Sequence, residues 1–203
     1  MARAGLDAAA VTDRAAQMLD EQMLDEQRGE GLSLAALASS LGVKTPSLYK
    51  HVDGLRGLTR AVMLRAKGDL GRAMGTAAIG LARGDAIVAM SFAYRRWSLE
   101  HPGQYPLTVR APVAGDDEDE RASAAILAVV LAALSGFGLH DDDATDATRF
   151  LRSALHGFVS LESTGAFELP RDTELSFTQL VNSVIASLEA QHSSGTQHSS
   201  ATQ

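Results

Sequence analysis

The chain has 203 residues, of which 45% are hydrophobic and 21% charged, an ordinary balance for one or two folded domains with a real core. It has no cysteine, which excludes disulfide bonds and thiolate chemistry and fits a reducing cytoplasm. No apolar run reaches the roughly 18 residues that a membrane span needs, and the first residues lack the pattern of a secretion signal, so we expect a cytoplasmic protein with no membrane contact.

The distribution of charge matters more than the net charge of −7, which by itself argues against a nucleic-acid partner. Residues 43–72 hold seven basic residues against two acidic ones, a local net charge of +5 that leaves −12 for the rest of the chain. The basic residues are Lys44, Lys50, Arg56, Arg60, Arg65, Lys67 and Arg72. The densest acidic runs lie at residues 116–120 and 141–143. A small basic face on an acidic protein favours local contact with phosphate and modest non-specific affinity for DNA.

The N-terminal part is expected to begin as a loose arm over residues 1–6 and to continue as a helix over residues 7–27. This helix contains a tandem repeat, because the MLDEQ sequence of residues 18–22 recurs at residues 23–27. Five added residues turn a helix by about 500°, so the second Met-Leu pair lies about 140° out of phase with the first. We therefore expect the second copy to form a longer helix end or to lie in the following loop, without a functional role.

Two short helical patterns, separated by a turn, come next. Ser33 is a favoured N-cap for the first, and Gly42 supplies the left-handed backbone that a helix stop requires. Thr45 is the expected N-cap of the second, with Pro46 at the first helical position, where its missing N–H costs nothing. The second helix is too short and too polar for a core element. This pattern predicts a helix-turn-helix.

The polar side chains around the second helix carry donors suited to phosphates and base edges. The residues that support DNA binding are Lys44, Thr45, Pro46, Ser47, Tyr49, Lys50 and His51. Of these, Lys44, Thr45 and Ser47 are best placed for base edges because they stand at the start of the helix. Two alternatives stay open. One is that the two helices form an ordinary helical hairpin in a bundle. The other is that a given side chain is only exposed to solvent or, in the case of Tyr49, half-buried in the core. The basic helix that follows favours DNA.

A long helix is expected over residues 54–76, capped by Asp53 and leading into the rest of the chain. Gly68, Gly71 and Gly75 each lower its intrinsic stability by about 1 kcal/mol relative to alanine. A hinge in this connecting helix and close packing against another helix explain the glycines equally well.

The remaining sequence predicts further helices and therefore an all-α fold. They are expected over residues 85–101, 120–134, 144–163 and 175–190, with a short turn of helix after a break at residues 101–106. Ser, Gln and Thr dominate residues 191–203, which are expected to be disordered.

Two parts of the sequence resemble a known family. Residues 31–58, GLSLAALASSLGVKTPSLYKHVDGLRGL, resemble the DNA-binding domain of TetR/AcrR-type transcriptional repressors. The sequences FAYRRWSLEHPGQYPL and ALHGFVSLESTGAFELPRDTELSFTQLV resemble the C-terminal domain of TetR-type regulators named for a Trp-His-Gly motif. Leu155 stands where the Trp would be, while His156 and Gly157 match. The implied domains are a DNA-binding head at 1–53, a connecting helix at about 54–76, a ligand-binding and dimerisation domain at 77–191 and a disordered tail at 192–203.

The resemblance also implies partners and their contacts. Ser33, Tyr49 and Lys50 are expected to contact phosphates of double-stranded operator DNA. A homodimer is expected because one recognition helix reads only a few base pairs, whereas two read successive major grooves of a palindrome. The expected dimer interface consists of Leu151, Leu155, Phe158, Phe177, Leu180, Val181, Val184 and Leu188. The expected ligand pocket consists of Met90, Phe92, Trp97, Tyr105, Phe137, Phe150 and His156. A small apolar or amphipathic effector would release the operator, which makes the protein a repressor.

Catalytic and metal sites find no support in the sequence. His101, His140 and His156 include no pair at i, i+4, and the acidic runs lack the spacing of a calcium loop. No nucleophile elbow, phosphate-binding glycine loop or dinucleotide fingerprint appears, so we expect neither an enzyme nor a cofactor. His156 is interpreted either as an interior histidine or as a ligand contact. The alternative function is a helical small-molecule sensor or adaptor whose head binds protein rather than DNA.

Overall fold

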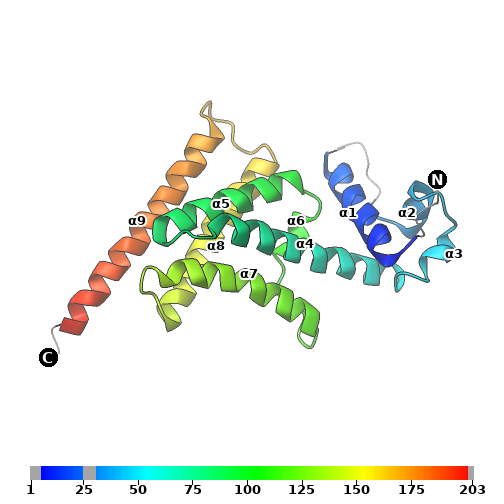
Figure 1. Ribbon diagram of the computed structural model, residues 1–203. Coiled ribbons are helices and arrows are strands. Elements are labelled where there is room, and N and C mark those ends of the chain that lie inside the picture. Colours follow the sequence, from blue (N-terminus) through cyan, green and yellow to red (C-terminus); the bar gives the residue numbers. More distant parts are fainter. Residues whose placement is uncertain (1–5, 25–30, 201–203) are drawn as a thin grey trace. The chain divides into compact units, whose positions relative to one another are not determined.

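The computed structural model describes residues 6–24 and 31–200, with side chains up to Ala190 (Figure 1). All regular structure in these residues is α-helical, which confirms the predicted all-α fold. The helices are α1 (Ala8–Leu24), α2 (Leu34–Ser40), α3 (Thr45–Leu48), α4 (Gly54–Ala78), α5 (Arg83–Glu100), α6 (Tyr105–Thr108), α7 (Asp117–Ser135), α8 (Asp141–Ser163) and α9 (Thr173–Ser200). Within the described ranges, none of them is both long and apolar enough to cross a membrane.

The internal contacts of the chain divide it into two compact units. The first unit comprises residues 1–69 and 100–123, and the second comprises residues 70–99 and 124–203. Helices α4 and α7 therefore contribute residues to both units, and the last residue of α5, Glu100, belongs to the first. The expected boundaries place residues 100–123 with the C-terminal domain, and in the structure these residues group with the first unit.

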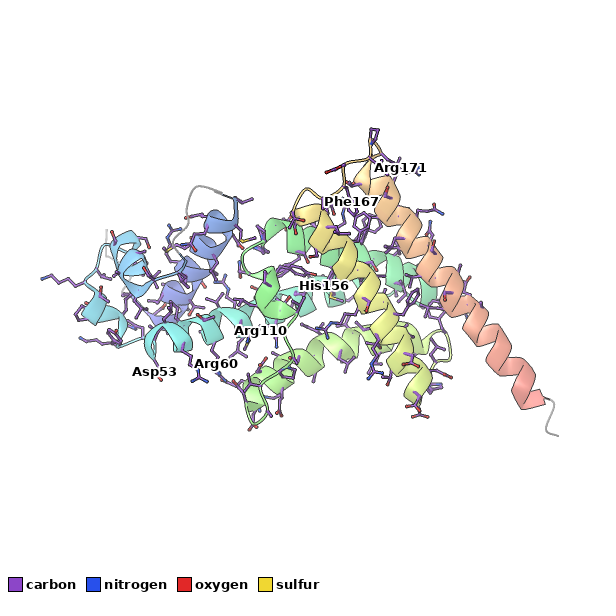
Figure 2. The ribbon with its side chains drawn as sticks, turned by 180° about the vertical axis from the view of Figure 1, so that it is seen from behind. Asp53, Arg60, Arg110, His156, Phe167 and Arg171 are labelled. Atoms are coloured by element: carbon purple, nitrogen blue, oxygen red, sulfur yellow. The ribbon has the colours of Figure 1, made fainter. Side chains whose placement is uncertain are left out.

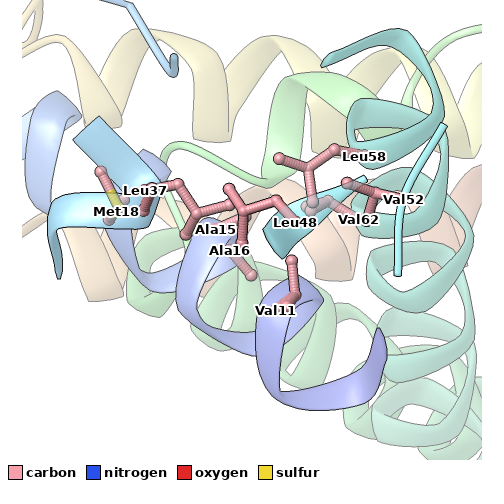
Figure 3. Close-up of a cluster of buried hydrophobic side chains, with 10 residues drawn as sticks. Val11, Ala15, Ala16, Met18, Leu37, Leu48, Val52, Leu58 and Val62 are labelled. Atoms are coloured by element: carbon pink, nitrogen blue, oxygen red, sulfur yellow. The ribbon is translucent and has the colours of Figure 1, made fainter. Parts of the chain in front are cut away.

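The first unit is held together by a small hydrophobic core. Asp7 begins α1 as its cap, since its Oδ1 accepts a hydrogen bond of 2.7 Å from the Ala10 N–H. One side of α1 then packs against α2, α3 and the start of α4 (Figure 3). The core residues are Val11, Ala15, Ala16, Met18, Leu37, Ala38, Leu48, Val52, Leu58 and Val62. Because Leu48 belongs to α3 and Leu58 to α4, this core fixes the short helix on its scaffold.

The two copies of the MLDEQ repeat have different environments. Met18, in the first copy, is 8% exposed and belongs to the core of the first unit. Met23 and Leu24, in the second copy, are 57% and 75% exposed at the end of α1. The expected longer helix end is therefore confirmed for these two residues, and residues 25–27 lie outside the described part of the chain.

The second unit is organised around an aromatic cluster. The fully buried ring of Phe177 lies 5.2 Å from that of Phe92 and 5.1 Å from that of Phe158, both in edge-on arrangements. The Arg95 guanidinium lies 5.2 Å from the centre of the Phe177 ring and pairs with Glu162 at 2.6 Å and 2.7 Å. These contacts join α5, α8 and α9, and the hydrogen bonds from Arg95 lower the pKa of Glu162.

The largest differences from the expected helix boundaries are at the starts of α7 and α8 and at the end of α9. Helices α7 and α8 begin three residues earlier than expected, so acidic residues form their first turns. This position is favourable because a helix N-terminus carries partial positive charge. Helix α9 continues to Ser200, so the tail expected to be disordered from Gln191 is helical for most of its length. Adding residues to an existing helix costs much less than starting one, which composition alone does not reveal.

Candidate nucleic-acid interface

Helix α2 and the turn after it have the geometry that the sequence predicts. Ser33 is the N-cap, and its Oγ accepts a hydrogen bond of 3.2 Å from the Ala36 N–H. Gly42 follows the helix with φ of +67°, the left-handed conformation that residues with a side chain rarely adopt. The Val43 N–H then donates to the Ala38 carbonyl at 3.0 Å and closes the turn.

Helix α3 starts differently from the prediction and is only four residues long. Lys44, not Thr45, is the N-cap, and Thr45 is the first helical residue. Proline is tolerated at either of the first two helical positions because neither N–H has a partner within the helix, so Pro46 did not determine the boundary. Residues 49–51 form a turn, in which the His51 N–H donates to the Leu48 carbonyl at 2.8 Å.

The residues expected to bind DNA form a surface around this short helix. Lys44, Pro46, Tyr49 and Lys50 are exposed, while Ser33, Thr45, Ser47 and His51 are half-buried. Tyr49 is 61% exposed, so its ring does not belong to the core. Leu48, between these polar positions, is fully buried. We call these eight exposed or half-buried residues, Ser33, Lys44, Thr45, Pro46, Ser47, Tyr49, Lys50 and His51, the recognition surface.

The basic face is smaller than the count of charges suggested. Three of the seven basic residues of positions 43–72 are engaged by carboxylates: Arg60 by Asp116 and Glu118, Arg65 by Asp13 and Asp69, and Lys67 by Asp119. Within the described part of the chain, Lys44, Lys50 and Arg56 have no such partner. The positive charge available to a polyanion is thus concentrated at α3 and the first turn of α4.

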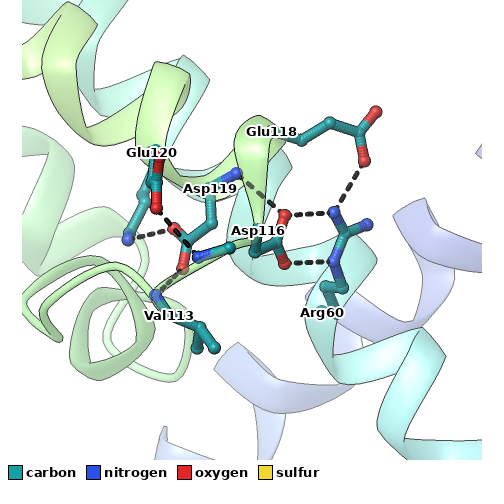
Figure 4. Close-up of polar contacts among 8 residues, drawn as sticks. Arg60, Val113, Asp116, Glu118, Asp119 and Glu120 are labelled. Atoms are coloured by element: carbon teal, nitrogen blue, oxygen red, sulfur yellow. Dashed lines mark hydrogen bonds and ion pairs between the residues drawn. The ribbon is translucent and has the colours of Figure 1, made fainter.

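The carboxylates that engage Arg60 lie at the start of α7 and in the residue before it (Figure 4). Asp116 accepts two hydrogen bonds from Arg60, at 2.6 Å and 2.5 Å, and Glu118 accepts a third at 2.7 Å. The bonds from Arg60 lower the pKa of Asp116 to about 2, and those to Asp116 and Glu118 raise the pKa of Arg60. This pairing was not predicted from the sequence, in which the only signal for it is the basic helix expected over residues 54–76.

A buried ion pair lies beside this surface cluster. Lys67 Nζ is 2.5 Å from Asp119 Oδ1 and 2.9 Å from Ser123 Oγ, and the Lys67 and Asp119 side chains are 1% and 0% exposed. The Val113 N–H donates to the other Asp119 oxygen at 3.0 Å. Burial raises the pKa of Asp119, but the bonds from Lys67 and Val113 outweigh this effect, so the pKa lies below its ordinary value.

His101, considered above as a metal ligand, instead belongs to a hydrogen-bonded turn. Asp20 accepts bonds from the Gly103 N–H at 2.9 Å and from the Gln104 side chain at 2.6 Å, and it lies 3.2 Å from His101 Nδ1. A Cβ at position 103 would overlap the carbonyl group of Leu19, so glycine permits this close approach. No group of three or more potential metal ligands occurs among the described residues.

The residues expected to line a ligand pocket do not share one environment. In the second unit, Met90, Phe137 and Trp97 are buried, whereas Phe150 is 45% exposed on the outer side of α8. Phe92 and His156 are half-buried, and Tyr105 belongs to the first unit. Two buried hydroxyls of the second unit, those of Ser91 and Thr148, have no hydrogen-bond partner.

The residues expected at a dimer interface are mostly internal to one chain. Seven of the eight are buried, and Leu180 is half-buried. The buried seven are Leu151, Leu155, Phe158, Phe177, Val181, Val184 and Leu188. Helices α8 and α9 use these apolar stripes for the core of the second unit, so one chain already covers these residues without a partner. Exposed apolar residues on the same two helices include Phe150, Leu161 and Leu175.

Comparisons with known proteins agree with this architecture. Residues 87–184 match the family described as the tetracyclin repressor-like C-terminal domain. The chain is 41% identical over 173 residues to the uncharacterized HTH-type transcriptional regulator Rv0681 of Mycobacterium tuberculosis, covering 85% of this chain and 79% of the relative. It is 32% identical over 171 residues to the uncharacterized HTH-type transcriptional regulator YobS of Bacillus subtilis, covering 84% and 86%.

Solved structures share the fold. A TetR variant from Acinetobacter baumannii in complex with minocycline has a TM-score of 0.68, with 18% identity and coverage of 93% of this chain and 99% of that chain. The TetR family protein ActR of Streptomyces coelicolor in complex with actinorhodin has a TM-score of 0.65, with 20% identity and coverage of 93% and 98%. Together with the 41% identity over most of both sequences and the match of the C-terminal part, this shows that the chain belongs to the TetR family of helix-turn-helix transcriptional regulators.

Proposed function

We propose that the protein is a dimeric repressor that binds a palindromic DNA operator and is released from it by a small effector. The observation that carries this proposal is the recognition surface, which presents exposed Lys44, Tyr49 and Lys50 at the two ends of a short helix fixed by the buried Leu48. A short, polar helix held on a rigid hydrophobic scaffold suits insertion into a major groove.

The recognition surface divides into two kinds of contact. Tyr49 and Lys50 follow α3 and are assigned to phosphates, as is Ser33. The Ser33 hydroxyl accepts its bond from Ala36 through a lone pair, so its own proton is available to a phosphate oxygen. Lys44, Thr45 and Ser47 stand at the start of α3 and are assigned to base edges.

The dimer is assigned to the outer faces of α8 and α9, in place of the buried residues named above. Phe150, Gly157 and Leu161 form a stripe at helical spacing on α8, and a Cβ built on Gly157 would have no other atom within 4 Å apart from its chain neighbours and the backbone of its own helix. Leu175 and Ser183 lie along the exposed side of α9. Apolar and small residues on adjoining helices favour close packing against a second copy, and two heads about 34–36 Å apart would match one turn of DNA.

The effector is assigned to the second unit and to the amphipathic class. Two relatives in fold are known in complex with minocycline and with actinorhodin, which supports a small-molecule ligand here. The unpartnered hydroxyls of Ser91 and Thr148 favour a ligand with hydrogen-bonding groups, because a buried polar group without a partner costs about 1–3 kcal/mol. We retain the Trp-His-Gly subtype for this unit, with the buried Leu155 in place of the Trp.

Release requires that the effector bind two dimer states unequally. A ligand that favours a dimer with wrongly spaced heads lowers operator affinity, whereas equal affinity for both states changes nothing. Operator occupancy would then block transcription until the effector accumulates.

A salt titration of DNA binding tests the proposal. Lys50→Ala is expected to weaken binding to all sequences alike and to reduce the slope of log K against log salt by about 0.9 for each head. Arg149→Ala removes the same charge from an exposed position of α8 and serves as the matched control. Salt-insensitive binding, or an equal effect of the two substitutions, would contradict the phosphate assignment.

A further inference from the structure

The start of α7 holds an arginine that the DNA-binding head would otherwise expose. We call Asp116, Glu118 and Asp119 the acidic clasp. Arg60, on α4, receives a bidentate contact from Asp116 and a third bond from Glu118 (Figure 4). Its side chain is still 41% exposed, so the contact lies at the surface and is open to competition by solvent ions.

A buried anchor keeps the clasp in place. Asp119 accepts from Lys67 at 2.5 Å and from the Val113 N–H at 3.0 Å in an environment closed to water. The Asp119 N–H also donates to Asp116 Oδ1 at 3.2 Å, which connects the anchor to the surface pair. The anchor and the surface contact are therefore one hydrogen-bonded network, in which only the surface part is accessible to a competing anion.

Arg60 stands on the side of α4 that continues from the recognition surface. It lies four residues after Arg56, one helical turn along the same face, and Arg56 is exposed in the first turn of α4. Figure 2 shows Arg60 extending from α4 on the same side as Asp53, which lies in the loop between α3 and α4. Within the first unit, Arg60 is thus the next guanidinium that a DNA backbone running past α3 would meet.

A phosphate and a carboxylate compete for the same geometry of arginine. The planar guanidinium forms two parallel hydrogen bonds with either group, and Asp116 holds it in that arrangement through Nε and Nη2. While Asp116 and Glu118 occupy Nε and Nη2, the bidentate edge of Arg60 is closed to a phosphate, and the two carboxylates add negative charge beside the path of the DNA.

We propose that the acidic clasp is an inhibitory contact that withholds Arg60 from the DNA backbone and lowers the affinity of each head. Opening of its surface part adds one phosphate contact per head. Helix α7 continues from the clasp into the second unit. A rearrangement of α7 therefore changes the clasp and, through it, the affinity for DNA. The inference rests on the proposed DNA binding and deepens its regulation.

The test compares two double variants of equal charge. Asp116→Asn with Glu118→Gln opens the surface contact, while Asp117→Asn with Glu168→Gln removes two exposed carboxylates, one from the same acidic run. We expect the first pair to bind duplex DNA about fivefold more tightly at 0.1 M salt, with a slope of log K against log salt steeper by about 1.8 per dimer. The control pair should show only the small gain that follows from net charge.

A third substitution identifies the cation. Adding Arg60→Gln to the clasp-opening pair should abolish both the gain in affinity and the steeper slope, whereas Arg60→Gln in the wild-type chain should change affinity less than twofold. If the double variant fails to fold, Glu118→Gln alone, whose carboxylate is 61% exposed, should give a smaller gain in the same direction. Circular dichroism establishes the fold of each variant.

The outcomes separate this inference from the proposed function. A wild-type protein that ignores DNA at low salt overturns both. Wild-type binding that responds to Lys50→Ala, combined with equal affinities for the clasp-opening and control pairs, overturns the clasp alone. A gain that persists after Arg60→Gln also overturns it, because another group would then be responsible.

Discussion

The buried pair between Lys67 and Asp119 offers the strongest test of the forces in the first unit. Lys67→Met keeps most of the side-chain volume and removes the ammonium group, so the Asp119 carboxylate retains only its bond from the Val113 N–H. Both side chains are at most 1% exposed, and an unpaired charge at such a site is costly. We expect the free energy of unfolding to fall by about 3–5 kcal/mol.

A surface pair provides the matched control. Arg14→Met breaks the ion pair between Arg14, which is 28% exposed, and Glu21, which is 47% exposed. The free energy of unfolding should fall by less than about 1 kcal/mol. Lys67→Met with Asp119→Leu removes both buried charges and should recover much of the loss, leaving the Val113 N–H as the group without a partner.

The assay is urea unfolding followed by circular dichroism at one protein concentration, since dimerisation would make apparent stability depend on concentration. A loss below about 1 kcal/mol for Lys67→Met would refute the reasoning, because it would mean that water reaches the carboxylate. A double variant less stable than the single variant would refute the assignment of the cost to an unpaired charge.

Three further predictions concern local features of the fold. Met18→Ala should lower the free energy of unfolding by about 2–3 kcal/mol, while Met23→Ala in the second repeat copy should stay within about 0.5 kcal/mol, as urea unfolding will report; equal effects would contradict the different burial of the copies. Gly42→Ala should lower the free energy of unfolding by about 1 kcal/mol, because φ at this position is +67° and disfavours a residue with a Cβ. An unchanged melting temperature would contradict this and mean that the turn adjusts to the new residue. Asp119 and Glu162 both have lowered pKa values, so the stability they contribute is present above about pH 4 and is lost as the pH falls through their folded pKa values; thermal melting from pH 6 to pH 2 measures it, and a constant melting temperature would contradict the pairing.

Local signals in the sequence were sufficient for the helix-turn-helix. A capping serine and a glycine in the left-handed region act within a few residues, so Ser33 and Gly42 could be assigned without knowledge of the rest of the chain. The start of α3 was misplaced by one residue because Pro46 fits either of two positions. Helix type was predictable wherever the apolar spacing was long and regular, as in α8.

Long-range pairings were not predictable from the sequence. Arg60 and Lys67 meet carboxylates that are 56 and 52 residues away, and a count of charges contains no information about such partners. The apolar stripes of α8 and α9 were correctly expected to be buried, but burial in the chain's own core and burial by a second copy remove the same surface from water. Phe177 and Leu188 were therefore assigned to an interface although they lie inside one chain.

Hydroxyl-radical footprinting of the purified protein on a DNA duplex selected for tight binding tests the central claim most directly. Two recognition surfaces held by a dimer should protect two segments on one face of the duplex, centred about 10–10.5 base pairs apart. A single protected segment, or protection of no sequence at low salt, would contradict the claim that two α3 helices read a palindromic operator.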